Sequence, residues 1–160
     1  MQSRDSYKKI WIDDALAEHR ELSIYRKGTV NFVRLTDQAY TVYNSFAIPA
    51  HDYAALFHFG IIEELNALPF LSETDNGLDS WDESFLPNSH IGRMVQILNA
   101  ALAKLSVAQD EEIMLGWQDA PEKLSYWRKI TAEDFREFLE KLIGFCEEAL
   151  RDGYDLEFIM

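Results

Sequence analysis

The sequence predicts an α+β fold in which a small antiparallel sheet, an N-terminal hairpin plus a C-terminal strand, is covered by three or four helices. Two observations lead to this prediction. Residues 21–47 and the last six residues alternate apolar and polar side chains with the period of a strand, whereas three later segments repeat apolar side chains with the period of a helix. A length of 160 residues is typical of one domain, so we expect residues 1–160 to share a single core.

The composition is that of a globular protein. Apolar residues make up 48% of the chain and only 7 glycines and 4 prolines interrupt it, which excludes disordered and collagen-like classes. No apolar run reaches the ~18–20 residues of a membrane span, and no signal-peptide core follows the N-terminus. The single cysteine, Cys146, cannot form an internal disulfide, which fits a reducing compartment. We therefore expect a cytoplasmic protein.

The N-terminal third contains the strands of the sheet. Residues 6–19 have the apolar spacing of a helix, although residues 8–12 also fit a strand, and both alternatives stay open. The alternation that begins at Glu21 predicts a β-hairpin whose turn is Lys27-Gly28, with Gly28 in a positive-φ conformation. Residues 39–47 are rich in β-branched and aromatic side chains, so we expect a third strand beside the hairpin.

After Pro49 the period changes to that of a helix. The segment begins at His51 or Asp52, either of which can cap it, and we expect it to end near Leu68, before Pro69. The predicted core face consists of the side chains at helical spacing, which are Ala54, Phe57, His58, Ile61, Leu65 and Leu68.

The second half of the chain predicts two more helices and a final strand. Residues 70–89 form a long connection, and residues 91–105 form an amphipathic helix capped by Ser89 or Asn88. Residues 106–130 are of mixed polarity and are predicted to be loop with short pieces of structure.

The last helix begins at Thr131, whose hydroxyl is expected to accept a hydrogen bond from the amide of Asp134, and it ends at Gly153. The alternation after Gly153 places Leu156, Phe158 and Met160 opposite Asp155 and Glu157, so we expect a strand that returns to the sheet.

The charge of the chain is strongly negative and unevenly distributed. The net charge is −13, so the field of the molecule repels phosphate backbones and anionic membranes, and we expect neither nucleic acid nor membrane as partner. The 58 residues between Arg34 and Arg93 contain no Lys or Arg but nine acids. This asymmetry favours a partner with a basic surface, and the alternative is a solvated face that keeps the protein soluble. The nine acids are Asp37, Asp52, Glu63, Glu64, Glu73, Asp75, Asp79, Asp82 and Glu83.

The loop within this acidic stretch is the candidate partner-binding site. Aromatic side chains surrounded by charges are frequent at interface hot spots, and here Trp81 and Phe85 alternate with acids. The alternative is that both aromatics only fix the loop to the body of the protein. The candidate site residues are Glu73, Asp75, Asp79, Trp81, Asp82, Glu83 and Phe85.

The sequence predicts neither a metal nor a cofactor. His51 and His58 are seven residues apart, which separates two imidazoles by about 10 Å along a helix axis, too far for one ion. We instead expect His58 to be buried and to donate to a backbone carbonyl. The acidic loop lacks the spacing of an EF-hand because Gly77 follows Asp75 by only two residues.

Catalysis has no supporting motif. Cys146, for which His19 or His90 could serve as base, lies on the apolar stripe of the last helix beside two glutamates, so a structural role is expected. Nucleophile-elbow, phosphate-loop and zinc-protease motifs are absent from the sequence, and no catalytic residue is assigned.

These observations favour a non-catalytic acidic module that binds a basic protein. In composition alone the chain resembles the small, acidic immunity proteins and antitoxins of bacteria, which implies inhibition of a toxin such as a nuclease. The alternative from another class is an enzyme or small-ligand binder with a pocket at His51 and His58. A third hypothesis is a structural subunit that forms a homo-oligomer through Leu56 and Phe59, which lie in the otherwise polar stripe of their helix.

Overall fold

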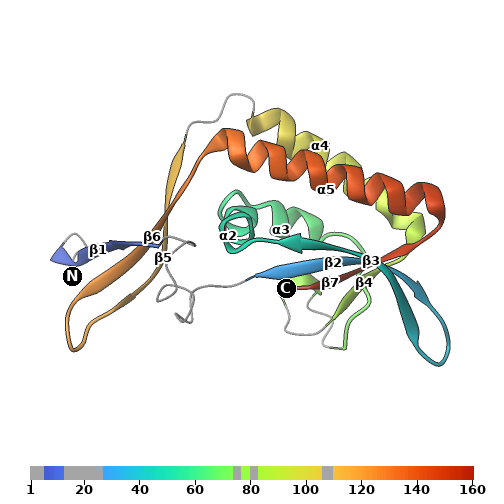
Figure 1. The fold of residues 1–160 in the computed structure, drawn as a ribbon, viewed down its shortest axis with the longest axis horizontal. Helices are drawn as coiled ribbons and strands as arrows, with labels where there is room; N and C mark the ends of the chain where they lie inside the picture. Colours follow the sequence, from blue (N-terminus) through green and yellow to red (C-terminus); the bar gives the residue numbers. More distant parts are fainter. Residues whose placement is uncertain (1–5, 13–26, 74–76, 80–82, 106–109) are drawn as a thin grey trace.

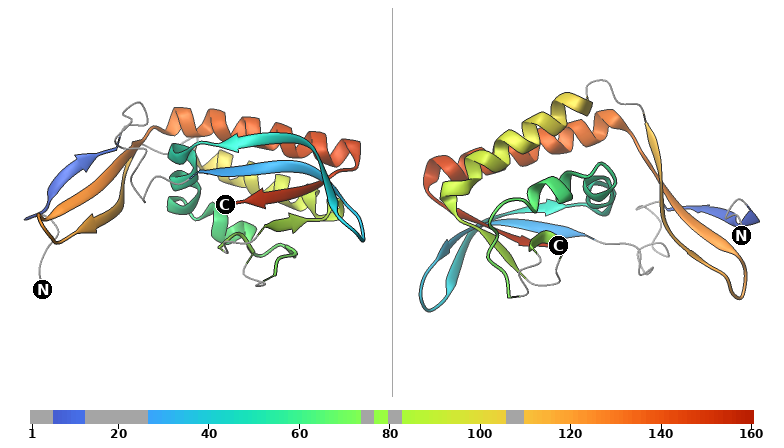
Figure 2. Two further views of the ribbon diagram at one scale, coloured as in Figure 1. Left: turned by 60° about the horizontal axis from the view of Figure 1, so that its bottom comes forward. Right: turned by 180° about the vertical axis from the view of Figure 1, so that it is seen from behind.

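The computed structural model describes residues 6–12, 27–73, 77–79, 83–105 and 110–160 and confirms the α+β class (Figure 1). The described part contains two sheets, one of four strands and one of three, together with four α-helices. The helices α4 and α5 lie side by side and cover one face of the four-stranded sheet, and the three-stranded sheet lies at the other end of the molecule (Figure 2).

The four-stranded sheet is antiparallel and has the order β3-β2-β7-β4. The predicted third strand and C-terminal strand are both confirmed, and the strand that begins in the 70–89 connection completes the sheet. Its strands are β2 (Gly28–Leu35), β3 (Tyr40–Ile48), β4 (Ser84–Leu86) and β7 (Asp155–Ile159).

The turn of the hairpin differs from the prediction. The chain reverses between β2 and β3, where the amide of Thr36 donates to the carbonyl of Ala39 at 3.1 Å. Gly28 instead begins β2 opposite Ile48 and has no positive φ. A side chain at Gly28 would lie 3.1 Å from the carbonyl oxygen of Ile159, so this glycine allows close packing rather than a turn. The predicted first arm of the hairpin, before Lys27, lies outside the described residues.

The three-stranded sheet was not predicted. It pairs β1 (Lys8–Trp11) in parallel with β6 (Leu124–Ile130), and β6 in antiparallel orientation with β5 (Glu111–Gln118). The structure therefore selects the strand alternative for residues 8–12, and the loop prediction for residues 106–130 is wrong. Most side chains of β5 are only half-buried or exposed, so the strand has little hydrophobic alternation to detect.

The predicted helix over residues 51–68 is divided in two. Helix α2 (Ala50–His58) and helix α3 (Ile61–Leu65) are separated at Gly60, whose φ is +73°. Pro49 occupies the N-cap position, without a side-chain cap from His51 or Asp52.

The break changes which side chains of α2 are buried. Leu56 is 2% exposed, whereas Phe57, placed in the core by prediction, is 41% exposed. The predicted face assumed one continuous helix, and the left-handed residue at Gly60 rotates the two segments relative to one another. Only the α3 part of the predicted face, with Ile61 and Leu65, is confirmed as buried, together with Leu68.

The two long helices are confirmed. Helix α4 (Ile91–Leu105) follows a short 3-10 turn, η3 (Asn88–His90), and helix α5 (Ala132–Asp152) ends at Gly153 with a φ of +78°. Thr131 is the N-cap residue of α5, but its hydroxyl makes no cap hydrogen bond, so that detail of the prediction is wrong. Among the described helices, none is long and apolar enough to cross a membrane.

The hydrophobic core lies between the helices and one face of the four-stranded sheet. Phe32 of β2 packs on Phe145 of α5 with ring centroids 4.0 Å apart, and Phe46 of β3 packs on Phe138 at 5.8 Å. Leu156 and Phe158 of β7 are almost completely buried on the same face. Because side chains alternate along a strand, Glu157 must then point to the opposite face of the sheet.

Asn88 joins three elements instead of capping α4. Its side-chain amide donates to the carbonyl of Ala149 at 3.1 Å and to that of Tyr154 at 2.7 Å. Its backbone amide donates to the carboxylate of Asp155 at 2.8 Å. The side chain of Asn88 thus links η3 to the last turn of α5 and to the residue that precedes β7.

We expect Asn88→Ala to lower the free energy of unfolding by about 1–2 kcal/mol, because the carbonyl of Tyr154 loses its donor and the side-chain link to Ala149 is lost. Asn99→Ala is the control, since the Asn99 amide donates only to the carbonyl of Val95 at 3.0 Å on the exposed side of α4. This control should change stability by less than about 0.5 kcal/mol. Urea denaturation of both variants measures the difference, and equal losses would contradict the role assigned to Asn88.

Candidate functional site

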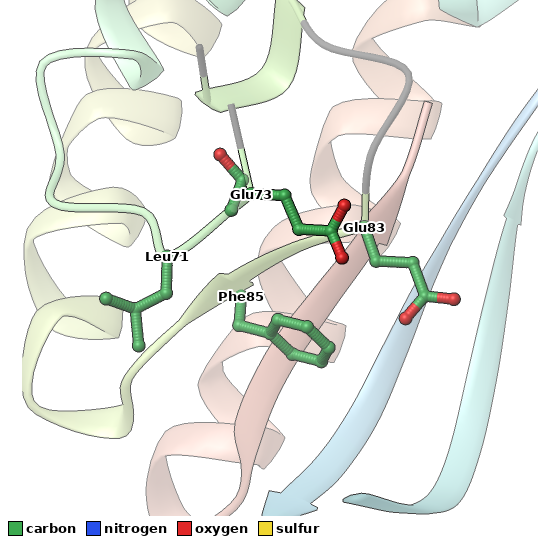
Figure 3. Close-up of a pocket in the computed structure, with 5 residues that line it drawn as sticks. Leu71, Glu73, Glu83 and Phe85 are labelled. Carbon is green, nitrogen blue, oxygen red and sulfur yellow. The ribbon is translucent and has the colours of Figure 1, made fainter. Parts of the chain in front are cut away.

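An open pocket of about 610 Å³ lies beside β4, within the predicted acidic site (Figure 3). Three of the predicted site residues, Glu73, Glu83 and Phe85, line it together with Leu71 and Ser72. Both glutamates are exposed and Phe85 is half-buried. The carboxylate of Glu73 is directed toward Glu83, and the ring of Phe85 lies below the two (Figure 3).

The side chains of the other predicted site residues lie outside the described part of the chain. Asp75, Trp81 and Asp82 lie outside the described residues. Asp79 ends the short 3-10 helix η2 (Gly77–Asp79), and its side chain is also outside the described part. The alternative role of Trp81, fixing the loop to the body, therefore stays a prediction.

Backbone hydrogen bonds position the two walls of the pocket. Leu71 and Phe85 exchange two of them, with N to O distances of 2.8 and 2.9 Å, so the segment around Leu71 runs beside β4 as an additional sheet edge. Nearby, the hydroxyl of Ser84 donates to the carbonyl of Gly77 at 2.6 Å and fixes η2 to β4. The described parts of residues 70–89 are thus held against β4 by hydrogen bonds.

A row of side chains connects the pocket to the middle of the sheet. In the register of the strands, Phe85 lies opposite Glu157, Glu157 opposite Asn31, and Asn31 opposite Ser45. All four side chains are therefore on the face that is turned away from α4 and α5. The hydroxyl of Ser45 donates to Asn31 Oδ1 at 2.6 Å, and the amide of Asn31 donates to Glu157 Oε1 at 2.5 Å.

Glu157 is the unusual member of this row. Its side chain is 0% exposed, and within the described part its second oxygen, Oε2, has no partner at hydrogen-bond distance. Burial raises the pKa of this carboxyl, and the carboxylate of Glu83 raises it further, while the Tyr40 hydroxyl and the Asn31 amide act in the opposite direction. The hydrogen bond between the Tyr40 hydroxyl and Glu157 is in turn the main reason why the pKa of Tyr40 is raised.

Glu157 lies on the predicted polar side of the last strand, but no sequence pattern identifies it as a site residue. The alternation indicates only that Glu157 faces away from Leu156 and Phe158. Its burial depends on neighbours that are distant in the sequence, namely Asn31 from β2 and Phe85 from β4. No local pattern around Glu157 carries that information.

Phe85 has a structural contact as well as a place in the pocket. Its ring meets the ring of Tyr40 edge-on, with centroids 5.1 Å apart. Part of the predicted alternative therefore holds for Phe85, because this residue does pack on the body of the protein. Its remaining exposed surface is what lines the pocket.

The histidines do not form the predicted arrangement. His58 is exposed, and its Nε2 lies 3.2 Å from Glu111 Oε2, so the expectation of a buried histidine bonded to a carbonyl is wrong. The cause is the break at Gly60, which turns the end of α2 outward. Neither His51 nor His58 lines either of the two pockets described here, the second of which is a 150 Å³ pocket near Lys104. Among the described residues, no group of three or more potential ligands could hold a metal ion.

Two further sequence-based hypotheses concern buried residues. Leu56 is 2% exposed, and the half-buried Phe59 stacks on Phe135 with centroids 5.3 Å apart, so the two side chains do not form the predicted exposed patch. Cys146 is fully buried, and burial raises the pKa of its thiol to about 12. Such a thiol is protonated at neutral pH, as its predicted structural role requires.

In comparisons with known proteins, no family model matches the chain, and neither the curated proteins nor the solved structures give a significant match.

We expect Glu157→Gln to stabilise the protein at neutral pH by about 1–3 kcal/mol, because a carboxyl whose ionisation is disfavoured by burial is replaced by a neutral amide. The folded-state pKa of Glu157 is raised, so the wild-type protein loses stability as the pH rises from the ordinary carboxyl pKa of the unfolded chain to the raised pKa of the folded protein. The gain in melting temperature over the wild-type protein should therefore shrink in acid, where Glu157 is already neutral.

Glu140→Gln, at an exposed position of α5, is the control and should show no such pH-dependent gain. Thermal unfolding of the three proteins between neutral and acidic pH measures the effect. A gain that is constant with pH would contradict the assigned ionisation of Glu157.

Proposed function

We propose that the protein is a non-catalytic binding module that uses the pocket beside β4 to engage a basic partner protein. The observation that carries this proposal is the pair of exposed carboxylates, Glu73 and Glu83, above the ring of Phe85 (Figure 3). Among the described residues that line the pocket, none is basic. An aromatic surface bordered by unpaired charge of one sign is the composition of an interface hot spot for a partner of opposite charge.

The charge of the whole chain supports the same partner class. With 28 acidic and 15 basic residues, the molecule attracts cationic proteins at long range and repels polyanions. Arg34, the nearest basic residue before the acidic stretch, has its guanidinium over the rings of Tyr43 and Tyr154, at 5.9 and 5.6 Å.

A nuclease toxin is the kind of partner we favour. Enzymes that bind nucleic acids carry basic surfaces because their substrates are polyanions. A small acidic protein that covers such a surface competes with the substrate and inhibits the enzyme without any chemistry of its own. The protein would then act as an immunity protein or antitoxin in the bacterial cytoplasm, in line with its composition.

The other hypotheses have less support. A ligand pocket at His51 and His58 requires the two imidazoles to converge, but His58 faces Glu111 at the surface. Self-association through Leu56 and Phe59 requires side chains that are instead packed in the core. A homo-oligomer through another surface is compatible with the proposed function.

We expect the double reversal Glu73→Lys and Glu83→Lys to abolish capture of the partner in a pull-down from the native host. For the purified partner, the association rate at low salt should fall by about tenfold or more, because the attraction at the pocket becomes repulsion. The matched control is Glu137→Lys and Glu140→Lys on the exposed side of α5, which changes the net charge equally.

The control should retain the partner and lose only the part of the rate that depends on net charge. Equal effects of the two double variants would show that the pocket has no special role. An unchanged association rate after reversal at the pocket would rule out the electrostatic mechanism.

A further inference from the structure

We propose that the pocket receives the side chain of one arginine from the basic partner. This inference rests on the proposed function and names the chemical group that is recognised. The guanidinium lies against the ring of Phe85 and donates to the carboxylates of Glu73 and Glu83.

The two outer carboxylates have the placement that a guanidinium requires. Glu73 follows the segment that pairs with β4, and Glu83 immediately precedes β4, so the two acids approach the pocket from different chain segments. Their side chains border the same open volume above Phe85 (Figure 3). A guanidinium has five N–H donors in one plane and can donate to two carboxylates at once.

The aromatic ring distinguishes arginine from lysine. Tyr40 holds the ring of Phe85 edge-on from one side, and the pocket lies on another side of that ring. A planar guanidinium can stack on an aromatic face while its edges donate to carboxylates, whereas an ammonium is a compact, strongly hydrated charge. The combination of ring and two acids therefore selects arginine.

A buried acid lies one strand inward from Phe85. The carboxyl of Glu157 is fully buried and accepts a hydrogen bond from the Asn31 amide at 2.5 Å. Burial and the neighbouring Glu83 carboxylate raise the pKa of Glu157. A guanidinium bound at Glu83 would lower this pKa, because an opposite charge nearby favours the ionised form of a carboxyl.

The test is an NMR titration of the whole protein with N-acetyl-L-arginine amide. We expect saturable shifts of the backbone amides confined to the segments around Leu71, Phe85 and Glu157. N-acetyl-L-citrulline amide has almost the same shape without the charge and should bind at least about tenfold more weakly, as expected when charged hydrogen bonds are lost. N-acetyl-L-lysine amide should also bind more weakly than the arginine compound. Equal binding of citrulline, or shifts spread over the whole acidic surface, would overturn the proposal.

Conservative variants separate recognition from folding. Glu83→Gln keeps the size of an exposed side chain and should weaken arginine binding by about tenfold, since one charged hydrogen-bond acceptor is lost. Glu157→Gln should weaken it by a smaller factor. Glu140→Gln on α5 is the matched control and should bind arginine as the wild-type protein does. Unchanged binding by Glu83→Gln would contradict the assigned site.

The outcomes also distinguish this inference from the proposed function. If charge reversal at Glu73 and Glu83 abolishes partner capture but the arginine amide does not bind saturably, the binding module stands and the arginine site is wrong. If the arginine amide binds at the pocket but the reversed variant still captures the partner, the arginine site stands and the proposed function is wrong.

Discussion

The pairing of β7 between β2 and β4 is the constraint on which the rest of the structure depends. This pairing brings together strands that are far apart in the sequence and aligns Phe85, Glu157, Asn31 and Ser45 in one row. The apolar side chains Leu156 and Phe158 fix which face of β7 meets the helices, because exposing either would cost about 2 kcal/mol or more. Glu157 consequently lies on the far face, where the register places it opposite Phe85, which lines the pocket.

The two faces of the four-stranded sheet therefore have different roles. The face below α4 and α5 contains closely packed aromatic rings, such as Phe32 against Phe145, and supplies most of the hydrophobic burial of the sheet. The opposite face carries the hydrogen-bonded chain from Ser45 through Asn31 to Glu157, which contributes little net stability and leaves one carboxylate oxygen unsatisfied. An incompletely satisfied polar network is typical of binding sites, where local stability is lower than in the core.

Helices and strands with strong periodicity or clear helix-end signals could be predicted from the sequence. Contacts between segments that are distant in the sequence could not. Helices α4 and α5 and strand β7 were predicted because each has one fully buried face and, for α5, a terminal glycine at residue 153. The prediction for α2 was wrong because Gly60, in a left-handed conformation, interrupts an apolar stripe that is continuous in the sequence. Strands β5 and β6 were not predicted because few of their side chains are buried, so their sequences show little hydrophobic alternation. Glu73, Glu83 and Phe85 were predictable from local composition, but Glu157 was not, since its environment comes from three strands.

The contact between Leu71 and Phe85 has a consequence for the range of shapes that the pocket can accommodate. In the described part of the chain, two peptide hydrogen bonds join this wall to β4, and breaking both costs on the order of 1–3 kcal/mol. The pocket can thus widen at modest energetic cost while the four-stranded sheet stays intact. Under the proposed function, a pocket with such a wall would tolerate changes in the size of the side chain that it receives.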